Sequence, residues 1–189
     1  QYNTAVGAKA LDANTTGNSN IAIGYAALDA NTTSANNVAV GNAALGANTA
    51  ANNTAVGNEA LQANTTGTLN TAVGGACLDA NTTGSNNTAL GRGALGANTT
   101  GEDNVAVGRS ALAAVTTNSY NTAVGDRALT VNTAELNTAV GSLSAYSNTS
   151  GTENTSIGQA SLYTNTTGSY NTAVGRYALR LNTTASHNT

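Results

Sequence analysis

The sequence predicts an all-β protein: a parallel β-solenoid, or β-roll, of about eleven coils, with 17 residues in most coils and 16 in two. Three observations predict this fold class. The phrase NTAVGAKALDANTTGNS (residues 3–19) recurs along the whole chain. β-branched residues alternate just before an invariant glycine, as in strands. A period of 17 residues is too short for a helix pair but fits one coil of two strands and two turns. Residues 1–189 then form a single repeat array.

The repeat assigns a residue type to each of its positions, which we number as slots 1 to 17 from the leading asparagine. Slot 2 is Thr, Val or Ile, slot 3 is Ala except Ser156, and slot 4 is Val, Ile or Leu. Slot 9 is Leu except Ala145, and slot 12 is Asn except Val115. We expect slots 2 and 4 on the first strand and slots 9 and 11 on the second to face a shared core.

Glycine fills slot 5 in all eleven copies, which predicts a corner that needs positive φ or close approach of another backbone. The two 16-residue steps follow copies with NTA in place of NTTG, at residues 48–50 and 132–134, so we expect a turn to absorb the deletion. The predicted corner glycines are Gly7, Gly24, Gly41, Gly57, Gly74, Gly91, Gly108, Gly125, Gly141, Gly158 and Gly175.

Asparagine at slots 1 and 12 predicts two ladders of stacked side-chain amides, because stacking places each slot above its copy in the next coil. Such ladders pair amide donors with acceptors along the axis and fix the register of the coils. The slot 1 ladder comprises Asn3, Asn20, Asn37, Asn53, Asn70, Asn87, Asn104, Asn121, Asn137, Asn154 and Asn171. The slot 12 ladder comprises Asn14, Asn31, Asn48, Asn64, Asn81, Asn98, Asn132, Asn148, Asn165 and Asn182.

Composition limits the core and the partners. The chain lacks Phe, Trp, Met and Pro, so any core is narrow and filled by small residues. Charged residues make up 8% and occur only at slots 6, 7, 10 and 15 to 17, which we expect to be solvated. With a net charge of −3 and no Lys/Arg cluster in the sequence, we expect no nucleic-acid partner. No apolar run approaches the length of a membrane span, so we expect none in this segment.

Slot 3 suggests contact with another copy of the chain. If slots 2 and 4 face inward, slot 3 faces outward as a row of small residues, where a solvated face would normally admit charge. We therefore expect an inter-chain seam, and the partner to be the protein itself, as a homo-oligomer or filament. The opposite parity, with slot 3 in the core and Thr/Val rows exposed, remains open. The seam residues are Ala5, Ala22, Ala39, Ala55, Ala72, Ala89, Ala106, Ala123, Ala139, Ser156 and Ala173.

No group of residues predicts catalysis. His187 is the only histidine and lies in a turn slot, and Cys77 replaces a small residue at slot 8, as a packed thiol would. Asp12 and Asp29 share slot 10 on adjacent coils and could hold a cation, although solvated carboxylates are the simpler interpretation. We expect no catalytic, cofactor-binding or metal site, and no enzyme activity.

Three features of the repeat suggest binding or modification, and each also has a structural explanation. Eleven Asn-x-Ser/Thr sequons could carry glycans, but eight fall at slot 12, where a structural ladder creates them. Threonine rows at slots 13 and 14 could order water as in ice-binding solenoids. Tyr146 and Tyr163, at slot 10 of adjacent coils, could contact sugars or simply stack on each other.

The repeat resembles two related groups of proteins. NIAIG at residues 20–24 and NVAVG at residues 37–41 and 104–108 resemble the strand motif of trimeric autotransporter adhesin heads. The whole phrase is similar to the repeat arrays of bacterial and phage tail-fibre-like proteins. The resemblance implies a left-handed, trimeric or otherwise oligomeric β-roll in a surface fibre. The adhesin heads have a shorter repeat than this chain.

We therefore expect a structural protein of an extracellular, cell-surface or virion fibre, filament or adhesin shaft, acting as a rigid rod without catalysis or a cofactor. Neither end carries a solenoid cap, so we expect a segment of a longer fibre. The alternative is an adhesin head, or another module that binds a surface glycan or host receptor. An ice-binding solenoid is the weaker alternative.

Overall fold

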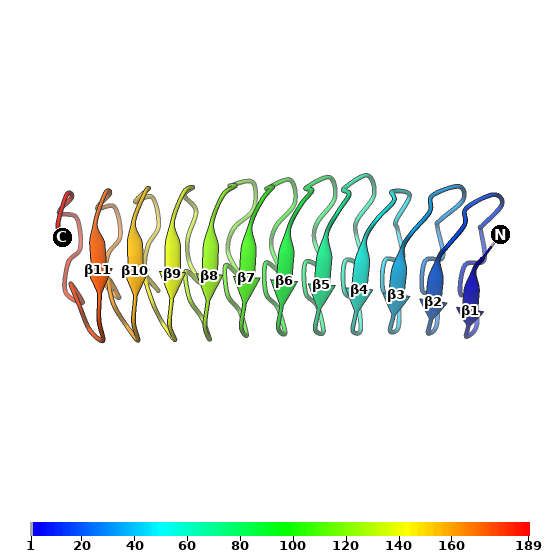
Figure 1. Ribbon diagram of the computed structural model, residues 1–189, viewed down its shortest axis with the longest axis horizontal. Helices are drawn as coiled ribbons and strands as arrows, with labels where there is room; N and C mark the ends of the chain where they lie inside the picture. The colour runs from blue at the N-terminus through cyan, green and yellow to red at the C-terminus, as the bar shows by residue number, and fades with distance from the viewer. Residues whose placement is uncertain (1) are drawn as a thin grey trace.

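A computed structural model describes residues 2–189 as one parallel β-sheet whose strands follow chain order from end to end (Figure 1). This arrangement confirms the predicted β-solenoid. Each coil contributes one three-residue strand from slots 2 to 4, immediately before the slot 5 glycine. The strands are β1 (Thr4–Val6), β2 (Ile21–Ile23), β3 (Val38–Val40), β4 (Thr54–Val56), β5 (Thr71–Val73), β6 (Thr88–Leu90), β7 (Val105–Val107), β8 (Thr122–Val124), β9 (Thr138–Val140), β10 (Thr155–Ile157) and β11 (Thr172–Val174).

The strands pair with equal slots opposite each other at every step. The register holds across the 16-residue steps too: Val38 pairs with Thr54 between β3 and β4, and Thr122 pairs with Thr138 between β8 and β9. The missing residue is therefore absorbed in the turn after slot 12, as the NTA sequences predicted. The spacing of the sequence repeat can vary by one residue without changing which side chains stack.

The second expected strand does not form. Slots 6 to 11 consist of successive turns instead, and the non-glycine residues of slots 7 and 9 adopt left-handed φ angles, such as 53° at Leu28 and 58° at Glu59. Amides at these slots bond to neighbouring coils: Leu28 N–H donates to Ala44 O at 3.1 Å, and Glu59 N–H donates to Asn42 O at 2.8 Å. Axial hydrogen bonds thus continue around the coil where no strand is present.

The core contains slot 3, and not slots 2 and 4. Ala39, Ala72 and Ala106 of slot 3 have no exposed surface, as do Leu45 and Leu78 of slot 9. Slot 8 is buried as well. The prediction that slot 3 faces outward is therefore wrong, and the opposite parity is correct. With one short strand facing the slot 9 leucines, the interior is too narrow for two β-branched rows and accepts a row of methyl groups.

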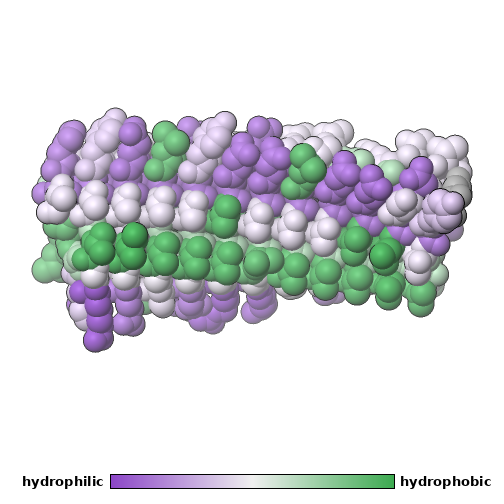
Figure 2. All heavy atoms as spheres, viewed as in Figure 1, coloured by the Kyte–Doolittle hydropathy of each residue, from purple (hydrophilic) through white to green (hydrophobic). Residues whose placement is uncertain are grey.

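The other side of the sheet, which we call the strand face, presents slots 2 and 4 to solvent. In Figure 2 the slot 4 side chains form a continuous apolar band along the rod, beside a paler row of mostly threonine from slot 2. Ile23, Val73 and Ile157 of slot 4 are 38%, 39% and 39% exposed. No charged residue occupies slots 1 to 5 anywhere in the array. The rod therefore has a long, uncharged, half-apolar face.

Candidate functional site

The slot 1 asparagines each bond to two coils, which makes them the most regular feature of the array. The side-chain oxygen of each accepts the backbone N–H of the slot 1 asparagine in the next coil, as Asn70 Oδ1 does from Asn87 N at 3.0 Å. The side-chain nitrogen donates to a slot 15 carbonyl in its own coil, as Asn87 Nδ2 does to Gly101 O at 2.8 Å. The slot 1 ladder thus bonds to the backbone at every step, and the expected amide-to-amide bonds add to it at some steps, as from Asn104 Nδ2 to Asn87 Oδ1 at 3.2 Å.

The slot 12 asparagines form the amide-to-amide ladder. Asn81 Nδ2 donates to Asn64 Oδ1 at 2.8 Å, and Asn98 Nδ2 donates to Asn81 Oδ1 at 2.8 Å. The same nitrogen also donates to the slot 15 carbonyl three residues later in the same coil, as Asn81 does to Gly84 O at 2.9 Å. Each amide therefore links its own turn to the coil before it.

This second ladder is interrupted at two places among residues 2–189. Asn98 Oδ1 is buried without a partner because Val115 occupies slot 12 of the next coil. Asn31 Oδ1 is also buried without a partner, at the step into the first 16-residue coil, where Asn48 Nδ2 bonds to Ala50 O instead. A shortened turn thus removes the amide contact, although the strand register is kept.

The slot 5 glycines meet both conditions that the sequence predicted for them. Gly91 has a φ of 131°, a region that L side chains rarely adopt. A Cβ there would lie 2.7 Å from the carbonyl carbon and oxygen of Gly108 in the next coil. Successive corners stack backbone on backbone, and any side chain would force the coils apart.

The predicted inter-chain seam lies inside the protein. From Ala22 to Ala173 the slot 3 side chains are fully or almost fully buried within the single chain, and only Ala5 in the first coil is exposed. They cannot contact a second chain without unfolding. The exposed rows of slots 2 and 4 are the surface that could do so. Slot 2 accepts both Thr and Val, which is typical of a half-exposed position. This mixture was the sign in the sequence that slot 2 faces solvent.

The remaining candidates do not converge on one site. Burial, the largest effect, raises the pKa of Cys77 to about 12, and its thiol donates to Ala89 O at 3.0 Å. Tyr146 and Tyr163 stack with ring centroids 5.5 Å apart. His187 stacks on Tyr170 at 5.0 Å. Within residues 2–189 no group of three or more His, Cys, Asp and Glu side chains is arranged to hold a metal ion.

Most slot 13 threonines donate their hydroxyl hydrogen to a backbone carbonyl of the next coil. Thr65 Oγ1 donates to Thr82 O at 2.9 Å, and Thr82 Oγ1 donates to Thr99 O at 3.0 Å in the following coil. From Asn31 onward, each slot 12 sequon asparagine donates two hydrogen bonds, one to a neighbouring side-chain amide and one to its own turn, as Asn31 and Asn81 do. In both rows, groups that suggested water ordering or glycosylation hold neighbouring coils together.

The structure also brings together three arginines that form no cluster in the sequence. Arg92, Arg109 and Arg127 lie on three consecutive coils around a surface hollow, although 17 or more residues separate them in the chain. The sequence could have predicted this proximity, because the repeat period places slots 6 and 7 of adjacent copies next to each other.

Comparison with protein-family models, curated proteins and solved structures returns no match. Among residues 2–189, no helix has the length and apolar character that crossing a membrane requires.

Proposed function

We propose that the chain is a rigid structural rod of an extracellular fibre, filament or adhesin shaft, and that it carries no reaction. The observation that supports this most is the continuity of axial bonding. Each coil is tied to the next by strand pairing, by turn amides and by slot 1 asparagines, as at Asn70 and Asn87. Because contacts are made almost only between neighbouring coils, such an array extends by repetition without changing shape.

The rod assembles with further copies of itself through the strand face, in place of the slot 3 seam. Eleven strands at about 4.8 Å spacing give a face about 50 Å long and about 10 Å wide, so pairing two faces removes about 1,000 Å² from water, near the lower limit for a specific interface. Exposed apolar patches above a few hundred Å² commonly mark interaction sites. The absence of charge at slots 1 to 5 lets identical faces approach without like-charge repulsion.

Charge placed on the strand face tests this assembly. The triple variant V56K/V107K/I157K adds three ammonium groups to slot 4, and T66K/T117K/T167K adds them to exposed slot 14 of the same coils. Sedimentation should give oligomers for the wild-type chain and the slot 14 control, and folded monomers for the slot 4 variant. A monomeric wild-type chain at all concentrations, or an associated slot 4 variant, would contradict self-assembly through this face.

One observation favours a second function, ice binding. The strand face carries paired outward rows, threonine at slot 2 and aliphatic residues at slot 4, as at Thr71 and Val73 of β5. Regular flat rows of this kind can order water at the spacing of the coils. The same variants decide it: thermal hysteresis in the wild-type chain that the slot 4 lysines abolish would favour ice binding over self-assembly.

A further inference from the structure

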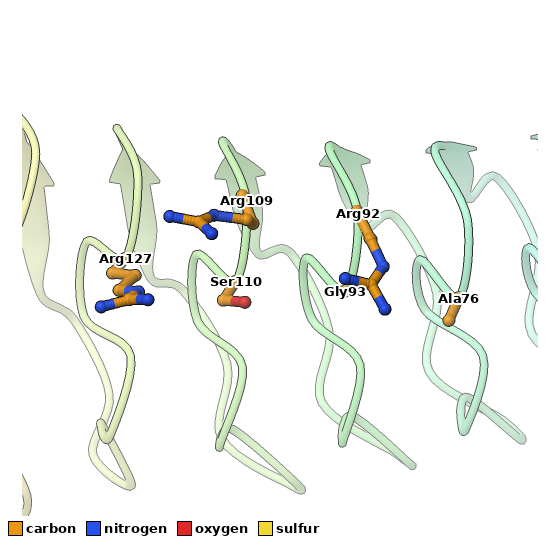
Figure 3. Close-up of a pocket in the computed structure, with 6 residues that line it drawn as sticks. All are labelled: Ala76, Arg92, Gly93, Arg109, Ser110 and Arg127. Atoms are coloured by element: carbon orange, nitrogen blue, oxygen red, sulfur yellow. The ribbon is translucent and has the colours of Figure 1, made fainter.

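Three arginines gather on one edge of the rod, in the turn that follows the slot 5 glycine (Figure 3). Arg92 and Arg109 occupy slot 6 of consecutive coils, and Arg127 occupies slot 7 of the coil after them. The whole chain has six Lys and Arg residues against nine Asp and Glu. Half of its positive side chains therefore lie within three coils.

Between these side chains the surface is hollow. Small residues at slot 7, namely Ala76, Gly93 and Ser110, line a hollow of about 320 Å³ together with the three arginines. Gly93 opens the centre, because a Cβ there would meet only Ser110 Oγ, at 3.9 Å. The volume is at the lower end of the range for ligand-binding pockets.

Only one of the three guanidinium groups is neutralised by an ion pair. Arg109 binds Asp126 with two hydrogen bonds, Nε to Oδ1 at 2.8 Å and an Nη to Oδ2 at 3.2 Å. This bond, the largest effect, lowers the pKa of the Asp126 carboxyl below its usual value, so the carboxylate is ionised at neutral pH. Within residues 2–189, no carboxylate lies within ion-pair distance of Arg92 or Arg127. Arg127 interacts with the Asp126 carboxylate only at longer range, so two guanidinium groups without a direct ion pair border the hollow.

We propose that this hollow binds the anionic groups of an acidic polysaccharide that lies along the rod axis. Arg92 and Arg127 stand two coils apart, about 10 Å, which one disaccharide unit spans. Guanidinium groups bind carboxylate and sulfate oxygens with paired hydrogen bonds. Ser110 supplies a hydroxyl to the sugar, and Arg109, which pairs with Asp126, lines the hollow beside it.

Nucleic acid fits this surface less well. Two free cations neutralise too few phosphates for appreciable affinity, since binding to nucleic acid depends on many such contacts. The six residues that surround the hollow include no aromatic side chain on which unpaired bases could stack. The surface therefore suits a ligand with sparse, regularly spaced charges.

The binding of a heparin dodecasaccharide, measured by calorimetry on the complete 189-residue chain, tests the proposal. The variant R92Q/R127Q removes both free charges, and R176Q/R180Q removes two charges elsewhere, where the arginines lie over Tyr177. We expect R92Q/R127Q to weaken binding roughly tenfold or more, and R176Q/R180Q to change it less than about twofold. An oligogalacturonate of equal length shows whether carboxylates alone are sufficient.

Several results would overturn the proposal. These are no binding of either oligosaccharide by the wild-type chain, equal weakening in the two variants, and binding of a single-stranded DNA dodecamer as tight as that of heparin. Circular dichroism of both variants confirms that each remains folded. Both pairs of arginines are exposed, so the fold should not depend on them.

Discussion

The slot 5 glycines permit a quantitative test of coil stacking, because one of them has no neighbour above it. Gly108 and Gly175 have nearly the same φ, 128° and 125°. A Cβ on Gly108 would lie 2.5 Å from Gly125 O and 2.6 Å from Gly125 C, whereas a Cβ on Gly175 would meet nothing within 4 Å. Gly175→Ala therefore reports the backbone strain alone, and Gly108→Ala reports strain plus the clash between coils.

The expected magnitudes follow from these two effects. Positive φ at a residue with a Cβ costs about 1–3 kcal/mol, and this applies to both variants. Forcing apart the closely stacked backbones at Gly108 costs about a further 1–3 kcal/mol, since the neighbouring atoms are main chain and cannot move away independently. Gly108→Ala should thus lower the free energy of unfolding by about 2–6 kcal/mol, and Gly175→Ala by about 1–3 kcal/mol.

Urea unfolding of the 189-residue chain, followed by circular dichroism, measures both losses under one set of conditions. The wild-type chain provides the reference, and the fitted slopes show whether the variants unfold in a comparable transition. Equal losses in the two variants would refute the argument, since the clash with the next coil would then contribute nothing.

Three further predictions concern the interior. Val115→Asn should supply a hydrogen-bond donor to Asn98 Oδ1. It should still lower the free energy of unfolding by about 1 kcal/mol in urea titrations, because the burial of valine is lost and the introduced amide oxygen faces a 16-residue coil, as Asn31 Oδ1 does. A gain in stability would contradict this expectation. Cys77, whose pKa is raised to about 12, should resist iodoacetamide in the folded chain and react with it in urea. Because the thiol ionises near pH 9.0 in the unfolded chain and only near 12 in the folded chain, rising pH above 9 should favour unfolding. The urea midpoint of the wild-type chain should therefore fall above pH 9, and that of Cys77→Ala should not fall for this reason. Ala106→Val, in the filled core, should cost about 1–3 kcal/mol in the same urea assay, and little loss would place slot 3 at the surface.

The sequence was sufficient to predict the period, the corners and the asparagine positions. Each of these depends on a residue type that has few substitutes. Only glycine fits at Gly91, where φ is 131° and the next backbone is in contact. At Asn87 the side-chain amide accepts from Asn104 N with its oxygen and donates to Gly101 O with its nitrogen, so two separate polar atoms are needed. Strict repetition of such residues identifies a structural requirement without any knowledge of the coordinates.

The facing of the strand could not be fixed in the same way. Alternation separates slot 3 from slots 2 and 4, but both parities are compatible with a short uncharged strand. The answer depends on the width of the coil: one three-residue strand opposite a left-handed turn leaves room for Ala72 and Leu78, and no room for Thr71 or Val73. The prediction of a second strand was wrong because slots 7 and 9 adopt left-handed φ angles. Residue types such as Glu59 and Leu61 rarely adopt these angles, so nothing in the sequence indicated them.

Electron–electron distances between nitroxide labels test the claim of a rigid stacked rod most directly. Cysteines replace Thr33 paired with Thr117, Ser150 or Thr167, all exposed at slot 14, in a chain with Cys77→Ala. These pairs lie five, seven and eight coils apart, so the rod predicts narrow distributions near about 24, 34 and 38 Å, a rise of about 4.8 Å per coil. Broad distributions, or distances that do not increase with the number of coils, would contradict the rod.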